Sequence, residues 1–156
     1  MTTSSALYLS EKIKLERYCA YEDRCVFQIK KKLFTSLLTD KEKAALILSL
    51  QSNKFLDDHR FACSYVSGKT RIKKWGEYKI RLGLKAYQID DQTIAIAMKE
   101  IQLDDYFKTL KDLIEKKSGQ LSSIDNEYEK KVKIIRFLVS KGYSLSDIYQ
   151  AGIDAD

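Results

Sequence analysis

The sequence contains no proline, and its 156 residues include only six glycines. A chain of average composition would carry about eight prolines. Their absence excludes collagen-like chains, proline-rich linkers and polyproline ligands, and it removes the commonest breaker of helices. The scarcity of glycine disfavours an all-β fold with many tight turns. These absences favour a helical protein.

Long apolar runs and paired cysteines are also missing. No apolar stretch reaches the roughly 18 residues of a membrane span, and residues 1–10 lack the basic start and apolar centre of a signal peptide. Cys19, Cys25 and Cys63 are an odd number and form no Cys-x-x-Cys pair. We therefore expect buried, reduced cysteines in a cytoplasmic protein, with no disulfide, metal or cofactor and no membrane contact.

Apolar residues recur with helical spacing, and no segment alternates with the period of a strand. Nine helices are expected, most of them opened by a residue that can cap a helix. Their expected starts are Ser10, Asp23 (favoured over Cys25), Thr39, Asp57 or Asp58, Trp75–Gly76, Asp90, Asp104 or Asp105, Asp125 and Ser144. The inward faces are expected to include Phe34, then Ala44, Ile47 and Leu48, and later Tyr128, Val132, Ile135 and Leu138. Residues 118–124, rich in Ser and Gly, are the candidate for a mobile hinge after a helix that ends before Ser118.

A pattern that occurs three times groups these helices in threes. Leu33, Leu84 and Leu138 are each followed five positions later by an apolar residue, and then at once by a capping residue. This order predicts an all-α fold of three tandem three-helix units in an elongated, curved array. The expected units are residues 1–56, 57–103 and 104–156. Such an array presents a long surface, which suits an extended partner better than a small substrate.

Several segments resemble the RecX regulators of the bacterial recombinase RecA. The central one is Asn53-Lys-Phe-Leu-Asp-Asp-His-Arg-Phe-Ala-Cys-Ser-Tyr-Val66, which contains Leu56, Asp57, Asp58, Arg60 and Phe61. Residues 24–33, 74–80 and 130–144 are similar to helices of the family's first, second and third units. The family often has Lys-Gly before the third helix of a unit. This chain keeps it only as Lys141-Gly142, so a lengthened or reshaped turn is expected in the first two units.

The resemblance implies a cytoplasmic protein that binds RecA filaments on single-stranded DNA, occupies their groove, and restrains ATP hydrolysis and strand exchange. It also implies a place in DNA repair, recombination and the SOS response. We expect a monomer that contacts RecA and can contact DNA directly. The chain carries no P-loop, dinucleotide fingerprint or nucleophile elbow, so no enzymatic activity is expected.

Basic residues concentrate in the middle unit. From Arg60 to Lys85 there are eight basic residues and one acid, Glu77, an excess larger than the net charge of +6 of the whole chain. The candidate contacts with a partner or DNA are Lys69, Arg71, Lys73, Lys74, Trp75, Lys79, Arg81 and Lys85. The alternatives are a solvated helix face for the charges and packing between units for Trp75. Lys30–Lys32 and the basic residues of 130–136 form weaker basic faces.

The adjacent carboxylates Asp57 and Asp58 are expected to be mainly structural. Acidic residues at a helix start cap free amides and complement the helix dipole, and Arg60 can pair with one of them. A contact with a partner is the alternative, and catalysis is disfavoured. His59, the only histidine, has no further candidate ligands around it. Besides RecA regulation, two other functions stay open: non-specific binding of nucleic acid, and a helical adaptor for another protein.

Overall fold

The computed structural model describes residues 3–154, and this part of the chain is all-helical, with no strand. The bounds of the helices are, in order, α1 Thr3–Tyr21, α2 Val26–Leu33, α3 Asp40–Ser52, α4 Asp58–Arg71, α5 Glu77–Ala86, α6 Asp91–Met98, α7 Leu103–Gln120, α8 Glu127–Ser140 and α9 Leu145–Gln150. None of these helices is long and apolar enough to cross a bilayer. The all-α prediction is confirmed.

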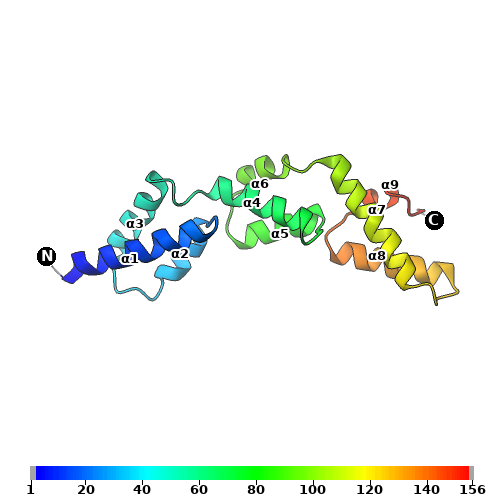
Figure 1. Ribbon diagram of the computed structural model, residues 1–156, viewed down its shortest axis with the longest axis horizontal. Coiled ribbons are helices and arrows are strands. Elements are labelled where there is room, and N and C mark those ends of the chain that lie inside the picture. The colour runs from blue at the N-terminus through cyan, green and yellow to red at the C-terminus, as the bar shows by residue number, and fades with distance from the viewer. Residues whose placement is uncertain (1–2, 155–156) are drawn as a thin grey trace.

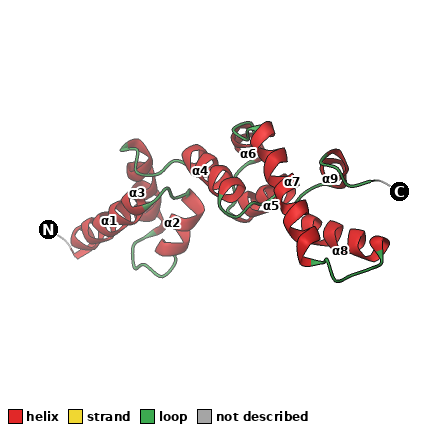
Figure 2. Cartoon of the chain, turned by 45° about the vertical axis from the view of Figure 1, so that its right-hand side comes forward, coloured by secondary structure: helices red, strands yellow, loops and turns green. Residues whose placement is uncertain are grey.

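The helices form three successive groups along an elongated molecule with its two ends far apart (Figure 1). Each group has its own cluster of buried side chains. Leu46 lies in the cluster of α1–α3, Ile94 in that of α4–α6 and Leu110 in that of α7–α9. Loops and turns connect the successive helices (Figure 2). The prediction of three tandem three-helix units is therefore confirmed.

The threefold pattern read from the sequence corresponds to one structural motif. Leu33, Leu84 and Leu138 are at most 1% exposed, and the apolar residues five positions later are also buried. The residue that follows each of these caps the third helix of its unit. Its side-chain oxygen accepts from a backbone N–H three residues on, as the sequence predicted, with Thr39, Asp90 and Ser144 as the capping residues.

The turn before the third helix has the same shape in the second and third units. In each, the buried apolar residue donates its N–H to the carbonyl of the repeated leucine, Ile89 to Leu84 and Tyr143 to Leu138. Gly142 adopts φ 102°, and Gln88 adopts φ 58° at the matching position. The expected reshaping is thus absent from the second unit, where Gln88 accepts a backbone conformation that favours glycine. The first unit does differ, because no positive φ occurs at 36–37 and the Ser36 hydroxyl accepts from the Leu38 N–H.

Several predicted helix starts are wrong. Ser10 lies inside α1, which already begins at Thr3. Cys25, rather than Asp23, is the N-cap of α2, and the Gln28 side chain accepts from its N–H. Gln102 precedes α7, so Asp104 and Asp105 lie in its first turn instead of capping it. Asn126, not Asp125, caps α8.

The predicted inward faces of α3 and α8 differ in part from the observed ones, and Phe34 is not buried. In α3 the buried residues are Leu46 and Leu50, while Ala44 and Leu48 are exposed. In α8 they are Ile134 and Leu138, while Tyr128 is exposed and Val132 and Ile135 are only partly buried. Phe34 is exposed after the end of α2. Because these helices carry apolar residues on more than one side, periodicity alone does not identify every buried position.

The predicted hinge at 118–124 is partly helical, because α7 continues through Ser118 and Gly119 to Gln120. A turn follows, and α8 begins at Glu127. A glycine in a helix interior is tolerated at a modest cost, and nothing lies within 4 Å of the space that a side chain at Gly119 would fill.

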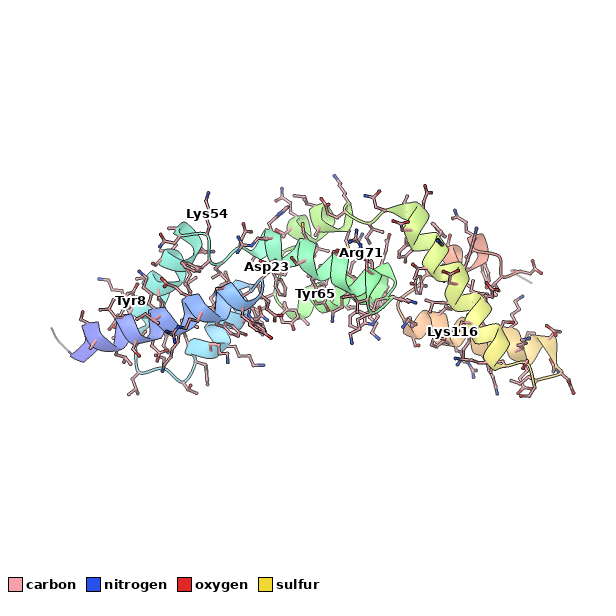
Figure 3. The ribbon with its side chains drawn as sticks, viewed as in Figure 1. Tyr8, Asp23, Lys54, Tyr65, Arg71 and Lys116 are labelled. Carbon is pink, nitrogen blue, oxygen red and sulfur yellow. The ribbon has the colours of Figure 1, made fainter. Side chains whose placement is uncertain are left out.

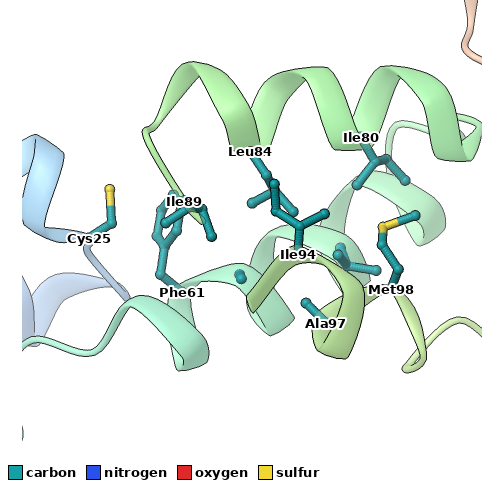
Figure 4. Close-up of a cluster of buried hydrophobic side chains, with 10 residues drawn as sticks. Cys25, Phe61, Ile80, Leu84, Ile89, Ile94, Ala97 and Met98 are labelled. Atoms are coloured by element: carbon teal, nitrogen blue, oxygen red, sulfur yellow. The ribbon is translucent and has the colours of Figure 1, made fainter. Parts of the chain in front are cut away.

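The first unit reaches into the core of the second. Cys25, just before α2, is fully buried in the cluster of α4–α6, beside the part of that core that contains Phe61 (Figure 4). Phe27 packs against the same cluster, and its ring meets that of Tyr87 edge to face, with centroids 6.3 Å apart. Ile101 packs against the clusters of both the second and third units. The three cores are thus joined by apolar contacts.

Candidate partner-binding surface at the second and third units

The predicted contact residues lie on the end of α4, on the turn 72–76 and on α5. Five of these side chains are exposed: Arg71, Lys73, Lys74, Arg81 and Lys85. Lys69, Trp75 and Lys79 are partly buried. The structure therefore places most of the predicted charge in solvent, where it can meet a partner.

Trp75 lies beneath two of these lysines. The Lys69 and Lys79 ammonium groups are 4.7 Å and 4.5 Å from the centre of the indole ring. A cation over an indole face is attracted by the ring quadrupole, so Trp75 holds both charges in place. Trp75 also packs against the apolar core of the second unit. This packing is within its own unit rather than between units, and contact of Trp75 with a partner stays a prediction.

The turn between α4 and α5 has a left-handed residue at its centre. Lys74 adopts φ 57°, and the Trp75 N–H donates to the Lys69 carbonyl at 2.9 Å. A lysine in this conformation costs backbone energy. Contacts from the third unit offset that cost, because the Tyr143 hydroxyl donates to the Lys74 carbonyl at 2.9 Å.

The third unit also supplies the caps of α5, whose own N-cap residue, Gly76, has no side chain. The Gly76 N–H donates to the Lys141 carbonyl at 2.8 Å, and the Tyr78 N–H donates to the Gly142 carbonyl at 3.0 Å. The Tyr106 hydroxyl accepts from the Glu77 N–H at 3.1 Å. Burial raises the pKa of the Tyr106 hydroxyl well above its ordinary value, so this phenol stays neutral. The amides at the start of α5 are thereby satisfied from a different unit.

Lys141 brings a further charge to this surface, one that was not among the predicted contact residues. Its ammonium group donates to the Lys73 carbonyl at 3.1 Å. The pKa of Lys141 is lowered by burial and then by the positive charges of Lys79, Lys74 and Lys73. The sequence did carry a signal, since Lys141 begins the Lys-Gly-Tyr-Ser segment that resembles the RecX pattern. We call Lys73, Lys74, Lys79 and Lys141 the joint lysines.

Arg71 has different surroundings from the joint lysines. It lines a cleft of about 520 Å³ between α4 and α7. Lys108 lies on the same cleft, together with the carboxylates Glu100, Asp105 and Asp112. This mixed charge makes the cleft a poor match for a polyanion, so Arg71 is set apart from the other predicted contacts.

The Leu-Asp-Asp-x-Arg-Phe motif forms the joint between the first and second units. Asp57 caps its own helix, α4, by accepting from the Arg60 N–H at 3.0 Å. Asp58 instead accepts from the Val26 N–H at 2.8 Å and so caps α2 in the first unit. Leu56 is buried in the core of the first unit and Phe61 in that of the second.

Arg60 pairs with neither of the adjacent aspartates through its side chain. Its Nε donates to Asp23 Oδ1 at 2.8 Å, and its two terminal nitrogens donate to the carbonyls of Lys54 and Phe55. The Ser64 hydroxyl donates to the other oxygen of Asp23. Asp23, labelled in Figure 3, thus receives two side chains of α4 instead of capping α2. Sequence reasoning missed this role because the two ends of the ion pair are 37 positions apart.

The remaining candidates are scattered. His59 is exposed, with its Nδ1 4.0 Å from Cys63 Sγ. Lys32 lies over the Tyr18 ring in the first unit, and Lys133 pairs with Glu129 in the third. Within residues 3–154, no three His, Cys, Asp or Glu side chains form a group that could hold a metal.

Two family models match this chain. The model of the RecX second three-helix domain matches residues 57–98, and that of the RecX third three-helix domain matches residues 104–151. The chain belongs to the RecX family. Both matches fall on the units that carry the joint lysines.

Curated RecX proteins are similar over much of this chain. "Regulatory protein RecX" of Pectobacterium atrosepticum is 31% identical over 110 residues, which are 70% of this chain and 65% of that protein. The RecX protein of Salmonella typhi is 30% identical over 96 residues, 62% of this chain and 55% of that protein. The RecX protein of Leuconostoc mesenteroides is 27% identical over 129 residues, which are 83% of this chain and 48% of that protein. The matched regions thus span less than two thirds of these relatives.

Solved RecX structures share the fold. The crystal structure of RecX from Lactobacillus salivarius matches with a TM-score of 0.85 at 22% identity, covering 94% of this chain and 95% of that one. A second crystal structure, of a regulatory protein RecX, matches with a TM-score of 0.83 at 22% identity, covering 95% of this chain and 72% of that one. The three-unit architecture is therefore that of RecX proteins.

Proposed function

We propose that this RecX-family chain regulates RecA by binding RecA filaments on single-stranded DNA and inhibiting ATP hydrolysis and strand exchange. It acts as a cytoplasmic monomer without catalytic activity of its own, in DNA repair and recombination and in the SOS response. The observation that carries this proposal is the elongated three-unit array, whose middle unit has eight basic residues and one acid between Arg60 and Lys85. An extended surface of this kind suits a filament, which repeats along its length.

The division of labour follows the predicted units, residues 1–56, 57–103 and 104–156. The middle unit faces DNA phosphates or acidic patches of RecA through Lys69, Lys73, Lys74, Lys79, Arg81 and Lys85. The outer units bridge neighbouring RecA protomers. This assignment is supported by the exposure of the middle-unit charges and by the location of the adjacent carboxylates Asp57 and Asp58 in a joint, where they serve the fold.

The deciding experiment measures RecA ATPase on single-stranded DNA with substoichiometric amounts of this chain. We expect inhibition below one chain per RecA protomer, since one elongated molecule reaches several protomers. Unchanged ATPase at every ratio would contradict the proposal.

Non-specific binding of nucleic acid is the second candidate, favoured by the charge of the joint lysines. It predicts binding to bare DNA that weakens steeply between about 50 and 200 mM salt, because bound phosphates release counterions. Tight binding to bare DNA without any effect on RecA would favour this candidate. A flat salt profile would instead favour an interface made mainly with protein.

A further inference from the structure

Four lysines from two units meet at the joint between the second and third units. The Lys141 ammonium group donates to the carbonyl of Lys73 at 3.1 Å. Lys74 follows directly, and its own carbonyl is held by Tyr143. Gly142 packs closely against the Cβ of Lys79. A Cβ added at Gly142 would lie only 2.5 Å from that atom. The backbone contacts that dock the two units therefore also gather these four charges.

Within residues 3–154, no carboxylate forms a salt bridge with a joint lysine. The ion pairs of the described residues lie elsewhere, as in Arg60–Asp23 and Lys133–Glu129. The pKa of Lys141 is lowered, first by burial and then by the charges of its three lysine neighbours. Like charges gathered in this way repel one another and destabilise the docked joint, and an anion bound among them would relieve that repulsion.

The geometry points to a binding site for a backbone phosphate of single-stranded DNA, formed jointly by Lys73, Lys74, Lys79 and Lys141, that fastens the second unit to the third when it is occupied. This inference rests on the proposed function and names the ligand and the effect of one part of its basic surface. Since the ligating groups come from two units, the phosphate binds the docked arrangement best and shifts the joint toward it.

A polymer of phosphates fits the surroundings better than a free ion does. Lysine ammonium groups bind phosphate as compact point charges. Beyond the joint lysines, α5 carries the exposed Arg81 and Lys85, and Lys69 lies over Trp75. A strand that places one phosphate among the joint lysines can therefore set neighbouring phosphates near further cations.

The single tryptophan of the chain makes the site directly observable. Trp75 lies 4.5 Å below the Lys79 ammonium group, so a phosphate that draws Lys79 toward it changes the surroundings of the indole. We expect the tryptophan fluorescence to change saturably when a short single-stranded oligonucleotide is added at low, fixed ionic strength. No RecA is present in this titration, so it reads the site alone.

The test compares Lys141→Gln with Lys116→Gln, which removes the same charge from an exposed position of α7 in the same unit (Figure 3 labels Lys116). Lys141→Gln should weaken oligonucleotide binding about five- to tenfold and reduce the slope of log K against log salt by about 0.7, the loss of one phosphate contact. Lys116→Gln should bind like the wild type, and Lys141→Arg should restore most of the affinity. Far-UV circular dichroism checks that every variant keeps its helicity.

Two results would overturn the inference. One is Lys141→Gln binding the oligonucleotide as tightly as Lys116→Gln does. The other is inorganic phosphate, at the same phosphate concentration and ionic strength, reproducing the full fluorescence change, which would assign the site to a free anion. RecA ATPase measured in parallel keeps the proposals apart. If the wild-type chain inhibits RecA ATPase but either of these two results is found, only the proposed phosphate site is refuted. If the tryptophan fluorescence responds to the oligonucleotide but RecA ATPase is not inhibited, only the proposed RecA function is refuted.

Discussion

Gly76 and Gly142, 66 positions apart in the sequence, lie back to back at the joint between the second and third units. A Cβ added at Gly76 would overlap the backbone of Gly142, and one added at Gly142 would overlap Lys79 and approach the Gly76 carbonyl. The absence of both side chains is what allows the start of α5 to take its caps from the backbone of Lys141 and Gly142.

The first prediction concerns this contact. Gly142→Ala should lower the free energy of unfolding by at least about 2 kcal/mol, since it adds an overlap to a left-handed backbone, φ 102°. Urea unfolding followed by circular dichroism measures the change. Gly68→Ala is the matched control. Gly68 lies inside α4 with open space around it, so alanine there should stabilise by about 0.5–1 kcal/mol. Equal effects at both positions would contradict the role of the close approach.

The second prediction concerns Gln88, which occupies the place of Gly142 in the second unit with φ 58°. Gln88→Gly should raise the free energy of unfolding by about 0.5–1 kcal/mol, because glycine adopts this conformation without steric cost. Leu37→Gly in the first unit is the comparison, since φ is not positive there and glycine should destabilise. Thermal unfolding of both variants checks the difference in sign.

The third prediction separates the two adjacent aspartates. Asp58→Ala should cost about 1 kcal/mol and should speed amide exchange at the start of α2, in a different unit from the substitution, because Asp58 accepts from the Val26 N–H. Asp57→Ala should cost a similar amount but open the start of α4. Hydrogen exchange resolved by residue distinguishes the two. Faster exchange confined to α4 in both variants would contradict the cross-unit cap.

The fourth prediction concerns acid stability. Hydrogen bonds from Thr93, chiefly from its backbone N–H, hold the pKa of Asp90 below its ordinary value of 3.8. Since the folded-state pKa is the lower one, the ionised cap stabilises the protein above the unfolded-state pKa, and its contribution disappears as pH falls through the folded-state pKa. Asp90→Asn should therefore flatten the loss of stability in this acid range.

Urea unfolding at a series of acidic pH values, with a carboxyl NMR titration of Asp90, measures this effect. Asp91→Asn, which leaves the cap of α6 in place, is the matched control. An Asp90 titration at or above its ordinary pKa would contradict the prediction.

The fifth prediction tests the basic surface. Lys73→Glu combined with Lys74→Glu should weaken binding to RecA–DNA filaments by about tenfold or more, because it reverses two exposed charges. Helicity should stay unchanged, since the contacts of this turn with the third unit use the backbone carbonyls of both residues. Lys30→Glu with Lys31→Glu, an exposed pair on α2, is the control and should have a smaller effect. Inhibition of RecA at wild-type levels by the first variant would remove the turn from the contact surface.

Local patterns in the sequence predicted the units well. Each of Thr39, Asp90 and Ser144 caps a helix through an atom three residues away, an interaction set by the local chain. The repeated leucines Leu33, Leu84 and Leu138 are all buried, and so is the apolar residue five positions after each of them. In every unit the capping residue of the third helix directly follows that second buried residue. Fold class and repeat number follow from such local rules.

The joints between units could not be predicted in this way. Asp23 was expected to cap α2, but its carboxylate instead accepts from Arg60 and Ser64 across the joint between the first and second units. The Val26 N–H at the start of α2 donates to Asp58 of the second unit. Lys141 likewise joins the basic surface of another unit only because the third unit docks there. These contacts depend on how the units pack, which no spacing within one unit encodes. The sequence therefore indicated the basic stretch from Arg60 to Lys85, but not that Lys141 of the third unit would join it.

The borrowed caps have a consequence for how the protein is made. The Val26 N–H at the start of α2 is satisfied by Asp58, 32 residues later, and the start of α5 by the backbone at Lys141 and Gly142. A ribosome delivers the chain from its N-terminus, so each of these helices is synthesised before the residues that cap it. The start of α2 can be capped only after Asp58 has been made, and the start of α5 only after Lys141 and Gly142 have been made. Folding during synthesis thus proceeds by each new unit completing the one before it.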